Sequence, residues 1–510
     1  MTQNKILSCG QNKWPMHRLL ILTLLLGSLR VLALRAEEPV YEFRGVWVAT
    51  VTNIDWPSQR ELPVEELKKE ALEIIELHHR LGMNALILQV RPSGDAIYPT
   101  PLAPWSVYLT GEQGKAPGGD FDPMQFWIEE CHKRGMELHA WINPFRASLH
   151  AADSLHLTHP ARVHPEWTIT HNGRLYYDPG LPQVHEHLLQ VLTDLLTRYR
   201  VDGLHIDDYF YPYPAVGQVF NDSASYLARL NFEEPLSIHD WRRQNTDRFV
   251  KASHELIKEL RPDVRFGVSP FGVWRNRSDD PRGSDSRAGI TSYDHLYADV
   301  IKWAREGWID YVAPQIYWST RDEAANYLKL ADWWNKNVEG ALLYIGHAIY
   351  KINGTQRHWD RPTELADQLR YARRLDKVSG SIFYSHNHFL RDNHQLAQLL
   401  SDTLYRNPAL VPPLERSRDV NIPPPSAVSN LQHKRGVLTW ELPAEEEQEN
   451  LRFLLFFSDR DNREERVVTQ STFYRLPPTL GRKRRYTVQV VAVDAHNNMS
   501  PRSETLRLRF

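Results

Sequence analysis

Val201-Asp-Gly-Leu-His-Ile-Asp-Asp-Tyr209 carries a short apolar strand directly into two adjacent carboxylates and an aromatic ring. Alternation along a strand sends Leu204 and Ile206 to one face. It sends His205 and Asp207 to the other face. A parallel strand covered by helices is normally apolar on both faces, so polar residues near its carboxyl end need hydrogen-bond partners and indicate a site. The stretch therefore predicts a parallel α/β fold with its functional site at the end of this strand.

The two carboxylates after this strand have a structural alternative. An Asp in such a place can cap the next helix by accepting hydrogen bonds from its first backbone N–H groups, and Asp208 suits that role better than Asp207. We take Asp207 as the first catalytic candidate and Asp208 as the second. His205 and Tyr209, which flank them, are candidates for substrate binding.

The chain from Tyr41 onward repeats the same pattern. Apolar runs of strand length alternate with amphipathic helical stretches, which are clearest at 64–81 and 182–199. About eight such units predict a (β/α)8 TIM barrel over 41–406. An open doubly wound sheet is the alternative, but it would place a glycine-rich phosphate loop where the chain has Trp47-Val-Ala-Thr50. The strand candidates are 43–50, 85–91, 137–143, 203–207, 264–269, 311–317, 342–347 and 381–386.

Polar residues gather at the predicted carboxyl ends of these strands, where TIM barrels carry their catalytic residues. Each could have a structural role by itself, but together they would line one mouth. Three long insertions, at 98–120, 147–178 and 212–238, would wall a groove above it, which fits a polymer better than a single sugar. The substrate-binding candidates at this mouth are Arg91, Trp141, Asn143, His205, Tyr209, Gln315, Tyr317, His347 and His386.

A mouth rich in aromatic rings, carboxylates, amides and histidines suits the hydrolysis of a neutral glycan. Two carboxyl groups normally share that reaction: one protonates the leaving oxygen, and the other attacks the anomeric carbon or activates water. Asp207 is our candidate for the nucleophile, base or charge-stabilising role. The second group is Asp208 or an acid of another loop, for which Asp55, Asp95 and Asp294 are candidates.

The composition and motifs of the chain argue against nucleic-acid and nucleotide partners. The 510 residues carry a formal net charge of -2 with scattered basic residues, which argues against a nucleic-acid surface. The chain has neither a phosphate loop nor a dinucleotide fingerprint. We therefore predict a polysaccharide partner, no nucleic acid and no cofactor, and the sequence carries no signal for an oligomeric state.

The N-terminus has the features of a secretory signal peptide, predicted over 1–36. An apolar run at 19–27 follows Arg18 and ends near Ala33-Leu-Arg-Ala36. The run is too short for a typical membrane-spanning helix, although an uncleaved anchor is an alternative. We predict an exported protein, periplasmic or associated with the cell envelope, with no membrane span after cleavage. Only Cys131 would then remain, so no disulfide within the chain is expected.

A second domain is predicted after the barrel. Prolines mark a linker over 407–426. Alternating strands then predict a small all-β immunoglobulin-like sandwich over 427–510. Its segment 486–494 resembles the closing strands of a fibronectin type III domain, a module that usually positions or binds. The strand candidates in this domain are 438–441, 452–457 and 486–493.

A series of motifs in order resembles the glycosyl-hydrolase-like 10 family. Its opening is matched by 42–50 and by Asn53-Ile-Asp-Trp-Pro57. The resemblance implies a TIM barrel with glycosidase activity, and members of this family are implicated in cutting bacterial cell-wall glycan. We therefore expect cleavage of O-glycosidic bonds in peptidoglycan glycan strands or a related polysaccharide. Further matches are 89–92 with Asp95-Ala96, 140–146, 202–209, 267–272 and 314–318.

The segment 201–209 also resembles the matching strand of family 18 chitinases, which ends Asp-Gly-x-Asp-x-Asp-x-Glu. Asp207 matches the last Asp, but His205 replaces the preceding one and Tyr209 stands where the acidic Glu would be. The likeness therefore indicates shared barrel architecture. One related hypothesis follows: an N-acetyl group of the substrate acts as nucleophile, Asp207 orients it, and Tyr317 contributes a hydrogen bond.

Two other functions compete with this prediction. In a metal-dependent hydrolase, histidines at the mouth would bind a metal together with Asp207, but no His-Glu-x-x-His signature is present and we predict no metal site. In a non-catalytic glycan-binding barrel, the aromatic residues would be kept without the chemistry. The histidines in question are His139, His347, His386 and His388.

Overall fold

The computed structural model describes residues 38–229, 236–352, 354–391, 395–414, 423–442, 451–461, 463–477 and 485–509. The predicted signal peptide lies outside these residues, as does 415–422 of the predicted linker. Within the described part of the chain, no helix is long and apolar enough to cross a membrane. Cys131 is buried and its thiol is free.

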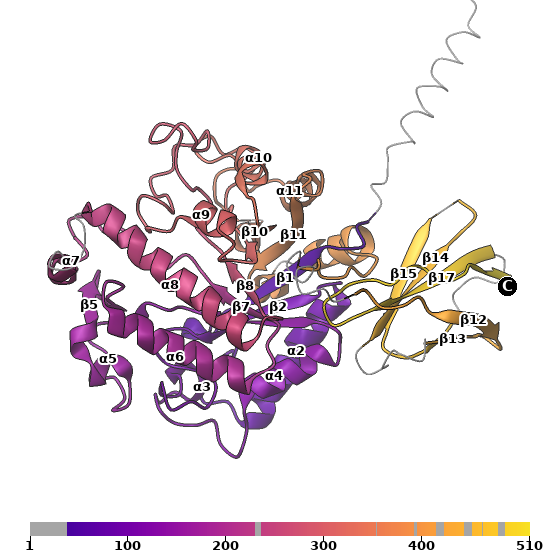
Figure 1. Cartoon of the computed structure of the whole chain (residues 1–510), viewed down its shortest axis with the longest axis horizontal. Helices are drawn as coiled ribbons and strands as arrows, with labels where there is room; N and C mark the ends of the chain where they lie inside the picture. Colours follow the sequence, from indigo (N-terminus) through magenta and orange to yellow (C-terminus); the bar gives the residue numbers. More distant parts are fainter. Residues whose placement is uncertain are drawn as a thin grey trace, which may run out of the picture. The chain divides into compact units, whose positions relative to one another are not determined.

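Eight parallel strands close into a barrel, as the sequence predicts for a TIM barrel (Figure 1). The strands follow one another around the ring in chain order, and β1 closes it against β11. β9 is only 2 residues long, much shorter than predicted, because Pro314 has no N–H for the ladder. The barrel strands are β1 (Phe43–Val48), β2 (Ala85–Arg91), β3 (Glu137–Ile142), β7 (Gly203–Ile206), β8 (Arg265–Val268), β9 (Tyr311–Val312), β10 (Leu342–Ala348) and β11 (Val378–Tyr384).

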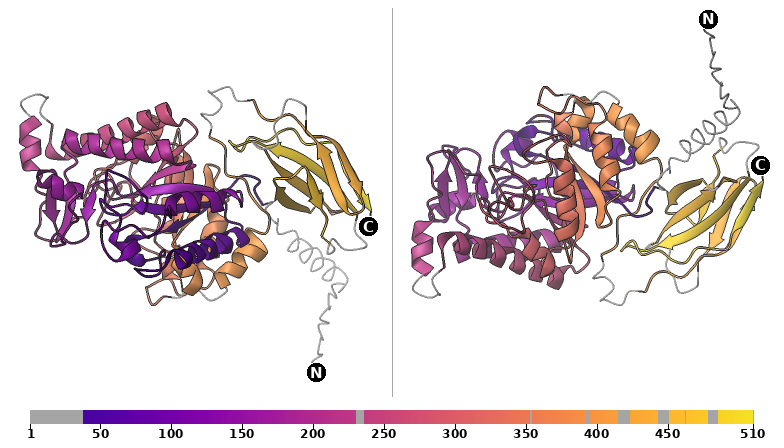
Figure 2. Two further views of the ribbon diagram at one scale, coloured as in Figure 1. Left: turned by 90° about the horizontal axis from the view of Figure 1, so that it is seen from below. Right: turned by 90° about the horizontal axis from the view of Figure 1, so that it is seen from above.

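Helices surround the barrel strands (Figure 2). The two clearest predicted helices correspond to α2 and α6. In α6, Val184, Leu188, Leu192 and Leu195 recur at helical spacing and are buried in the main hydrophobic core. The helices are α2 (Val64–Arg80), α3 (Val107–Thr110), α4 (Pro123–His132), α5 (Pro160–Val163), α6 (Pro182–Arg198), α7 (Ser223–Arg229), α8 (Ile238–Leu260), α9 (Val300–Arg305), α10 (Tyr327–Asn337), α11 (Glu364–Ala372), α12 (His386–Arg391) and α13 (Gln395–Leu399).

Aromatic rings fill the barrel interior. Phe43 stacks on Tyr344, with the ring centroids 4.2 Å apart. The Tyr311 hydroxyl is hydrogen-bonded to the Nδ1 atoms of His139 and His205, each at 2.9 Å. Tyr311 and the two histidines are therefore linked by hydrogen bonds inside the barrel, as buried polar groups require.

Gly267 of β8 leaves the space that the Tyr311 ring occupies, because a Cβ at this position would overlap the ring. We expect Gly267→Ala to lower the free energy of unfolding by about 1–3 kcal/mol through overpacking. Thermal unfolding followed by circular dichroism measures the change. Gly289→Ala is the control, because a Cβ there would meet no atom within 4 Å. An unchanged melting temperature for Gly267→Ala would contradict this description of the interior.

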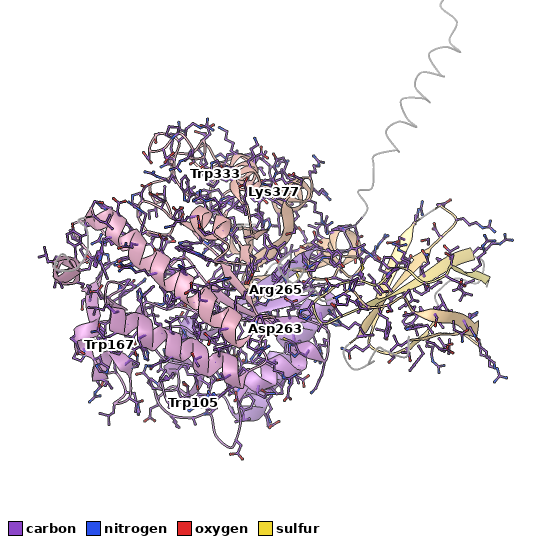
Figure 3. The ribbon with its side chains drawn as sticks, viewed as in Figure 1. Trp105, Trp167, Asp263, Arg265, Trp333 and Lys377 are labelled. Carbon is purple, nitrogen blue, oxygen red and sulfur yellow. The ribbon has the colours of Figure 1, made fainter. Side chains whose placement is uncertain are left out.

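Ionic groups lie at the amino ends of the barrel strands. Arg265 Nε is 3.4 Å from Glu137 Oε2, and His139 Nε2 is hydrogen-bonded to the same oxygen at 3.0 Å. Asp263 precedes Arg265, the first residue of β8 (Figure 3). Asp263 pairs with Arg261 at 2.6 Å. These groups are thus structural ion pairs at the end of the barrel opposite to the one that carries catalytic residues in TIM barrels.

The predicted insertion after β3 forms a small antiparallel sheet. In it β4 (Arg146–Ser148) pairs with β6 (Arg174–Tyr177), and β6 pairs with β5 (Thr168–His171). The sequence predicted an insertion here but not these strands. Rigid strands hold side chains in place better than a loop does, which matters below for the two arginines at the starts of β4 and β6.

The C-terminal part is all-β in its described residues, as predicted. It has two antiparallel sheets, in the orders β12-β13-β16 and β15-β14-β17-β18. Trp440 and Phe453, one from each sheet, pack together with their ring centroids 5.2 Å apart. The immunoglobulin-like and fibronectin type III assignments stay predictions. The strands are β12 (Ser429–Lys434), β13 (Val437–Glu441), β14 (Arg452–Ser458), β15 (Glu464–Thr469), β16 (Phe473–Arg475), β17 (Arg485–Val493) and β18 (Leu506–Arg509).

The first residues of the predicted linker extend along the start of the barrel chain. The Leu410 N–H donates to the Val40 carbonyl at 2.8 Å, and the Glu42 N–H donates to the Leu410 carbonyl at 2.9 Å. Leu410 is also buried in a small apolar cluster. This part of the segment 407–426 is therefore packed against the start of the barrel chain.

Candidate functional site

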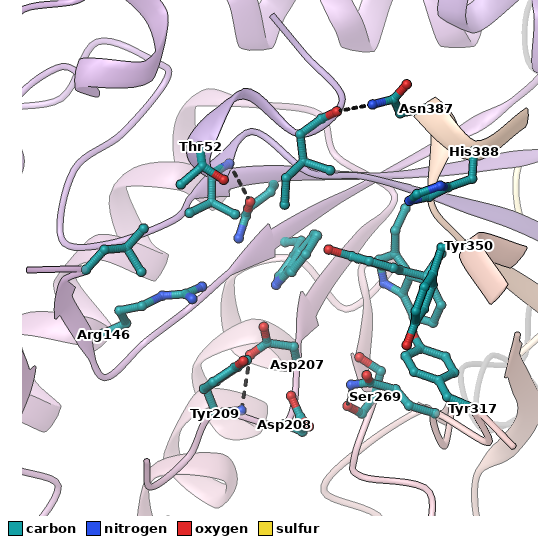
Figure 4. A pocket seen from close by; sticks show the side chains of 18 of the residues that line it. Thr52, Arg146, Asp207, Asp208, Tyr209, Ser269, Tyr317, Tyr350, Asn387 and His388 are labelled. Atoms are coloured by element: carbon teal, nitrogen blue, oxygen red, sulfur yellow. Dashed lines mark hydrogen bonds between the residues drawn. The ribbon is translucent and has the colours of Figure 1, made fainter. Parts of the chain in front are cut away.

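A pocket of about 700 Å³ lies at the carboxyl ends of the barrel strands (Figure 4). Its walls come from the carboxyl ends of the barrel strands and from the loops that follow them, including those after β9 and β10. This is where a TIM barrel carries its active site. The lining residues are Trp47, Val51, Thr52, Asn53, Ile54, Gln89, Trp141, Arg146, Leu149, Arg174, Asp207, Asp208, Tyr209, Tyr213, Ser269, Gln315, Tyr317, Tyr350, Tyr384, Asn387, His388 and Arg391.

A chain of side-chain amides holds Asp207 in one orientation. Gln89 Oε1 accepts two hydrogen bonds from backbone N–H groups after β1, at 3.0 and 2.9 Å. Its amide nitrogen therefore donates to Asn143 Oδ1, at 2.7 Å. This leaves the amide nitrogen of Asn143 to donate to Asp207 Oδ2. The backbone N–H of Tyr209 donates to Asp207 Oδ1 at 3.3 Å, so both carboxylate oxygens are fixed.

Asp207 and Asp208 differ in their electrostatic environment. Both carboxyl groups are buried, and burial raises the pKa of each. At Asp207 this rise is opposed by the positive charge of Arg146 and by the Asn143 amide. At Asp208 the negative charge of Asp207 adds to it, and the pKa of Asp208 is raised to about 7. The titrations of the two neighbouring groups are therefore linked, and the negative charge of Asp207 favours the protonated form of Asp208.

This pair can act on a glycosidic bond. A protonated Asp208 can donate to the leaving oxygen, and an ionised Asp207 can stabilise positive charge at the sugar. The Tyr213 hydroxyl donates to Asp208 Oδ2 and so orients that carboxyl group. The predicted alternative, that Asp208 caps a helix, is wrong, because the next helix, α7, begins only at Ser223.

Aromatic side chains form much of the pocket wall, including Trp47, Trp141, Tyr209, Tyr317 and Tyr384. Such rings can stack on the apolar faces of sugars. Burial raises the pKa of the Tyr317 and Tyr384 hydroxyls, so both keep their protons at neutral pH and can donate hydrogen bonds. The pocket therefore offers stacking surfaces and neutral donors around the two carboxyl groups.

The structure brings together part of the predicted site. The predicted pair and four of the predicted substrate-binding residues line the pocket, while the others lie behind it. Those in the lining are Asp207, Asp208, Trp141, Tyr209, Gln315 and Tyr317; those outside it are Arg91, Asn143, His205, His347 and His386.

Asn143 and His205 lie behind the pocket surface and position other groups. Asn143 orients Asp207, as described above. His205 points into the barrel interior, as its place on β7 predicts, and is hydrogen-bonded there to Ser269 at 2.8 Å and to the Trp47 indole at 3.2 Å. Both Trp47 and Ser269 line the pocket, so His205 supports the wall of the site.

His347 and His386 were predicted to line the mouth, and the structure corrects both. On β10 the interior side chain is Tyr344, and alternation turns His347 to the outer face, where it is hydrogen-bonded to Gln368 at 3.2 Å. His386 follows the end of β11 as the first residue of α12, and it contacts His78 of α2 at 3.0 Å. His347 lies on its predicted strand but on the outer face, whereas His386 lies outside its predicted strand because β11 ends at Tyr384.

Arg91 was also predicted to line the mouth and instead lies behind it. The pairing of β2 with β3 shifts register between Gln89 and Arg91. This bulge inserts one extra residue and turns Arg91 away from the face that Gln89 occupies. The Arg91 side chain is fully buried, with its guanidinium 6.0 Å from the centroid of the Tyr177 ring.

The other candidates for a second carboxyl group have structural partners outside the pocket lining. Asp55 accepts hydrogen bonds from the backbone N–H groups of Ala49 and Asn387, at 2.8 and 2.7 Å. Asp95 accepts from Gln113 at 3.5 Å. Asp294 pairs with Arg275 at 2.8 Å. Among the described residues of the lining, Asp207 and Asp208 are thus the only carboxylates.

The residues considered as metal ligands do not converge. His139 is hydrogen-bonded within the barrel interior, and His347 and His386 face helices. Asp207 and His388 remain in the pocket lining. In the described part of the chain, no group of three or more His, Cys, Asp or Glu residues could hold a metal ion.

Several lining residues were not among the predicted candidates. Arg146 belongs to a motif that the sequence showed, but its role could not be inferred from that motif. Arg174, Tyr213 and Tyr350 lie in insertions or loops that carry no periodic signal. Gln89 belongs to the matched segment 89–92, and only the hydrogen bonds across β2 and β3 reveal that it orients Asn143.

Comparison with known proteins gives consistent matches. The Glycosyl hydrolase-like 10 family model matches residues 42–361. Glycosyl hydrolase YngK of Bacillus subtilis (strain 168) is 40% identical over 477 residues, covering 91% of this chain and 92% of that protein. Glycosyl hydrolase DigH of Escherichia coli (strain K12) is 38% identical over 387 residues, covering 71% of this chain and 87% of that protein.

Among solved structures, the PgaB (BpsB) glycoside hydrolase domain from Bordetella bronchiseptica matches 72% of this chain and 99% of its own, with 14% identity and a TM-score of 0.46. The family model covers more than half of the chain, and the relatives named above are similar over most of their length. The chain therefore belongs to the Glycosyl hydrolase-like 10 family, and it is a glycosidase.

Proposed function

We propose that this protein is an exported glycosidase that cleaves O-glycosidic bonds in the glycan strands of bacterial peptidoglycan or a related polysaccharide. The observation that carries the proposal is the pair Asp207 and Asp208, two adjacent buried carboxyl groups that are held by different partners in an aromatic pocket. The long insertions around the mouth favour a polymeric substrate. The apolar run at 19–27 favours export.

In the proposed reaction the substrate supplies its own nucleophile. Asp208 donates its proton to the glycosidic oxygen as the C1–O bond breaks, and the carbonyl oxygen of the substrate's N-acetyl group attacks C1 to form an oxazolinium ion. Asp207 accepts a hydrogen bond from the acetamide N–H, and Tyr317 donates one to the sugar. Water then attacks C1, Asp208 takes up the released proton, and the configuration at C1 is retained.

Two features of the pocket support this assignment. The pocket lining has no further carboxylate among its described residues to act as a separate nucleophile. Asp207 is held by Asn143 and by the Tyr209 N–H, which suits a group that orients a substrate and stays in place. Asp208 is the group whose pKa matches a proton donor near neutral pH.

Activity is expected to fall as the pH rises through about 7. Asp208 must be protonated to act as the acid, and its raised pKa means that the proton is present below about 7 and lost above it. Protonation of Asp207 ends the activity at low pH, so kcat follows a bell-shaped profile. Measuring kcat from about pH 4 to about pH 10 tests this. A constant kcat across the alkaline half of that range would contradict the role given to Asp208.

Release of reducing ends from purified, peptide-free cell-wall glycan tests the proposed substrate. Chitin and plant polysaccharides are the competing substrates. We expect release from cell-wall glycan and its loss in Asp207→Asn. Asp263→Asn is the matched control, because Asp263 lies at the amino end of β8 (Figure 3) and pairs with Arg261. Release from plant polysaccharide alone, or from none of these glycans, would overturn the proposed substrate.

A further inference from the structure

Three arginines line the pocket, and the reaction proposed above uses none of them. Two of the three, Arg146 and Arg174, come from the small sheet that follows β3. Arg146 begins β4 and Arg174 begins β6, the two paired strands of the small sheet after β3. Both are in the pocket lining, and Figure 4 shows Arg146 pointing into the pocket. A neutral sugar needs no cation for recognition, so the presence of two guanidinium groups here requires a reason.

Arg146 is held by one edge only. Its Nε donates to the Pro92 carbonyl at 2.8 Å, and its guanidinium lies 5.0 Å from the centroid of the Tyr209 ring. Its two terminal nitrogens make no hydrogen bond and no ion pair with any described residue, and they are not sealed off as buried atoms without partners. The outer edge of this planar group is therefore free to receive a ligand from the pocket.

Arg146 has no carboxylate partner of its own although only 5% of the residue is exposed. Asp207 is near enough for the two charges to interact, but no nitrogen of Arg146 is within 4.0 Å of its oxygens, the limit for an ion pair. A buried guanidinium without a paired anion is costly, and an anionic group on the substrate would offset that cost.

Arg174 also lines the pocket without a carboxylate partner among the described residues. Its side chain is half-buried and makes no hydrogen bond or ion pair with any described residue. Its positive charge acts to lower the pKa of the Tyr209 hydroxyl, as does that of Arg146. The two arginines thus present positive charge on the same side of the pocket, around Tyr209.

We propose that Arg146 and Arg174 bind a carboxylate on an acidic sugar of the substrate, a specificity that rests on the proposed function. In a peptide-free peptidoglycan strand that carboxylate is the end of the lactyl ether on every second sugar. A guanidinium presents two parallel N–H donors that match the two oxygens of a carboxylate. The two arginines therefore select acidic glycan and set which sugar occupies the pocket beside Asp207 and Asp208.

Selective reduction of the carboxyl groups tests this directly. Peptide-free strands are compared with the same strands after their carboxylates have been reduced to primary alcohols, which removes the charge and keeps the backbone. For the native protein we expect kcat/KM to be about 10- to 100-fold higher on the unreduced strands, as a charge-assisted hydrogen bond implies. In Arg174→Gln and Arg146→Gln this ratio falls toward one, and in Arg174→Lys part of it returns. Arg305→Gln, an exposed arginine outside the pocket, is the matched control and keeps the native ratio.

Binding gives a second readout that does not need turnover. Calorimetry with Asp208→Asn and short strands should show tighter binding of the unreduced form, with the difference reduced by salt. If native protein cleaves both forms equally well, or Asp208→Asn binds both equally, the carboxylate site is overturned while the proposed activity stands. If native protein cleaves neither form, the proposed substrate is overturned, and the binding comparison still decides whether the arginines recognise a carboxylate. A fall in kcat of Arg146→Gln that is equal on both forms would mean that Arg146 only tunes Asp207.

Discussion

Replacing Asp208 with Asn is expected to slow the cleavage of glycan strands by about two to four orders of magnitude, the range that a positioned proton donor contributes. The introduced amide keeps the size of the side chain and can still accept the hydrogen bond from the Tyr213 hydroxyl. It has no proton to give to the leaving oxygen. The variant should therefore lose far less activity on an aryl glycoside, whose leaving group needs no protonation, than on the glycan strands.

The comparison of these two substrates decides the role of Asp208. The measurement is kcat for native protein and for Asp208→Asn on each substrate, with circular dichroism to show that the variant is folded. Asp263→Asn should match the native protein on both substrates, because it changes a carboxylate at the amino end of β8, whereas the pocket lies at the carboxyl ends of the strands. Equal losses on the strands and on the aryl glycoside would exclude Asp208 as the proton donor.

Most of the fold could be predicted because strand periodicity reflects packing. Each barrel strand buries an outer face against helices, so apolar residues must recur at every second position. On β7, Leu204 and Ile206 join the outer core and His205 points inward, as predicted. The rule fails where the strand is irregular. The bulge in β2 turned Arg91 to the other face, and His386 lies beyond the last residue of β11.

The candidate site could be predicted only in part, because its geometry depends on contacts between strands. The chain that orients Asp207 runs through Gln89 and Asn143, which lie on different strands and are 54 residues apart. A single strand gives no sign of such a partner. Arg174 and Tyr213 come from insertions, where the backbone path is set by tertiary packing and carries no repeat. The carboxyl pair was found because it adjoins a strand whose register the sequence does show.

Asp207→Asn is expected to lower kcat on glycan strands by about two to three orders of magnitude, the loss typical of removing one preorganised electrostatic partner of the transition state. The introduced amide removes the negative charge that stabilises the oxazolinium ion. It also meets a donor on each side, because Asn143 Nδ2 and the Tyr209 N–H both point at Asp207. Either orientation of the new side chain sets its NH2 group against one of these donors, so the geometry of the group is lost as well.

The same strands with and without their N-acetyl groups separate the two possible roles of Asp207. If the substrate supplies the nucleophile, native protein should not cleave de-N-acetylated strands, and re-acetylation of the strands should restore cleavage. A thiazoline mimic of the oxazolinium ion should then bind native protein more tightly than it binds Asp207→Asn. If Asp207 itself attacks C1, de-N-acetylated strands should still be cleaved and a fluorinated substrate analogue should become covalently attached to Asp207. That second result would make Asp207 the nucleophile and leave the role of Asp208 as acid unchanged, because protonation of the leaving oxygen is common to both routes.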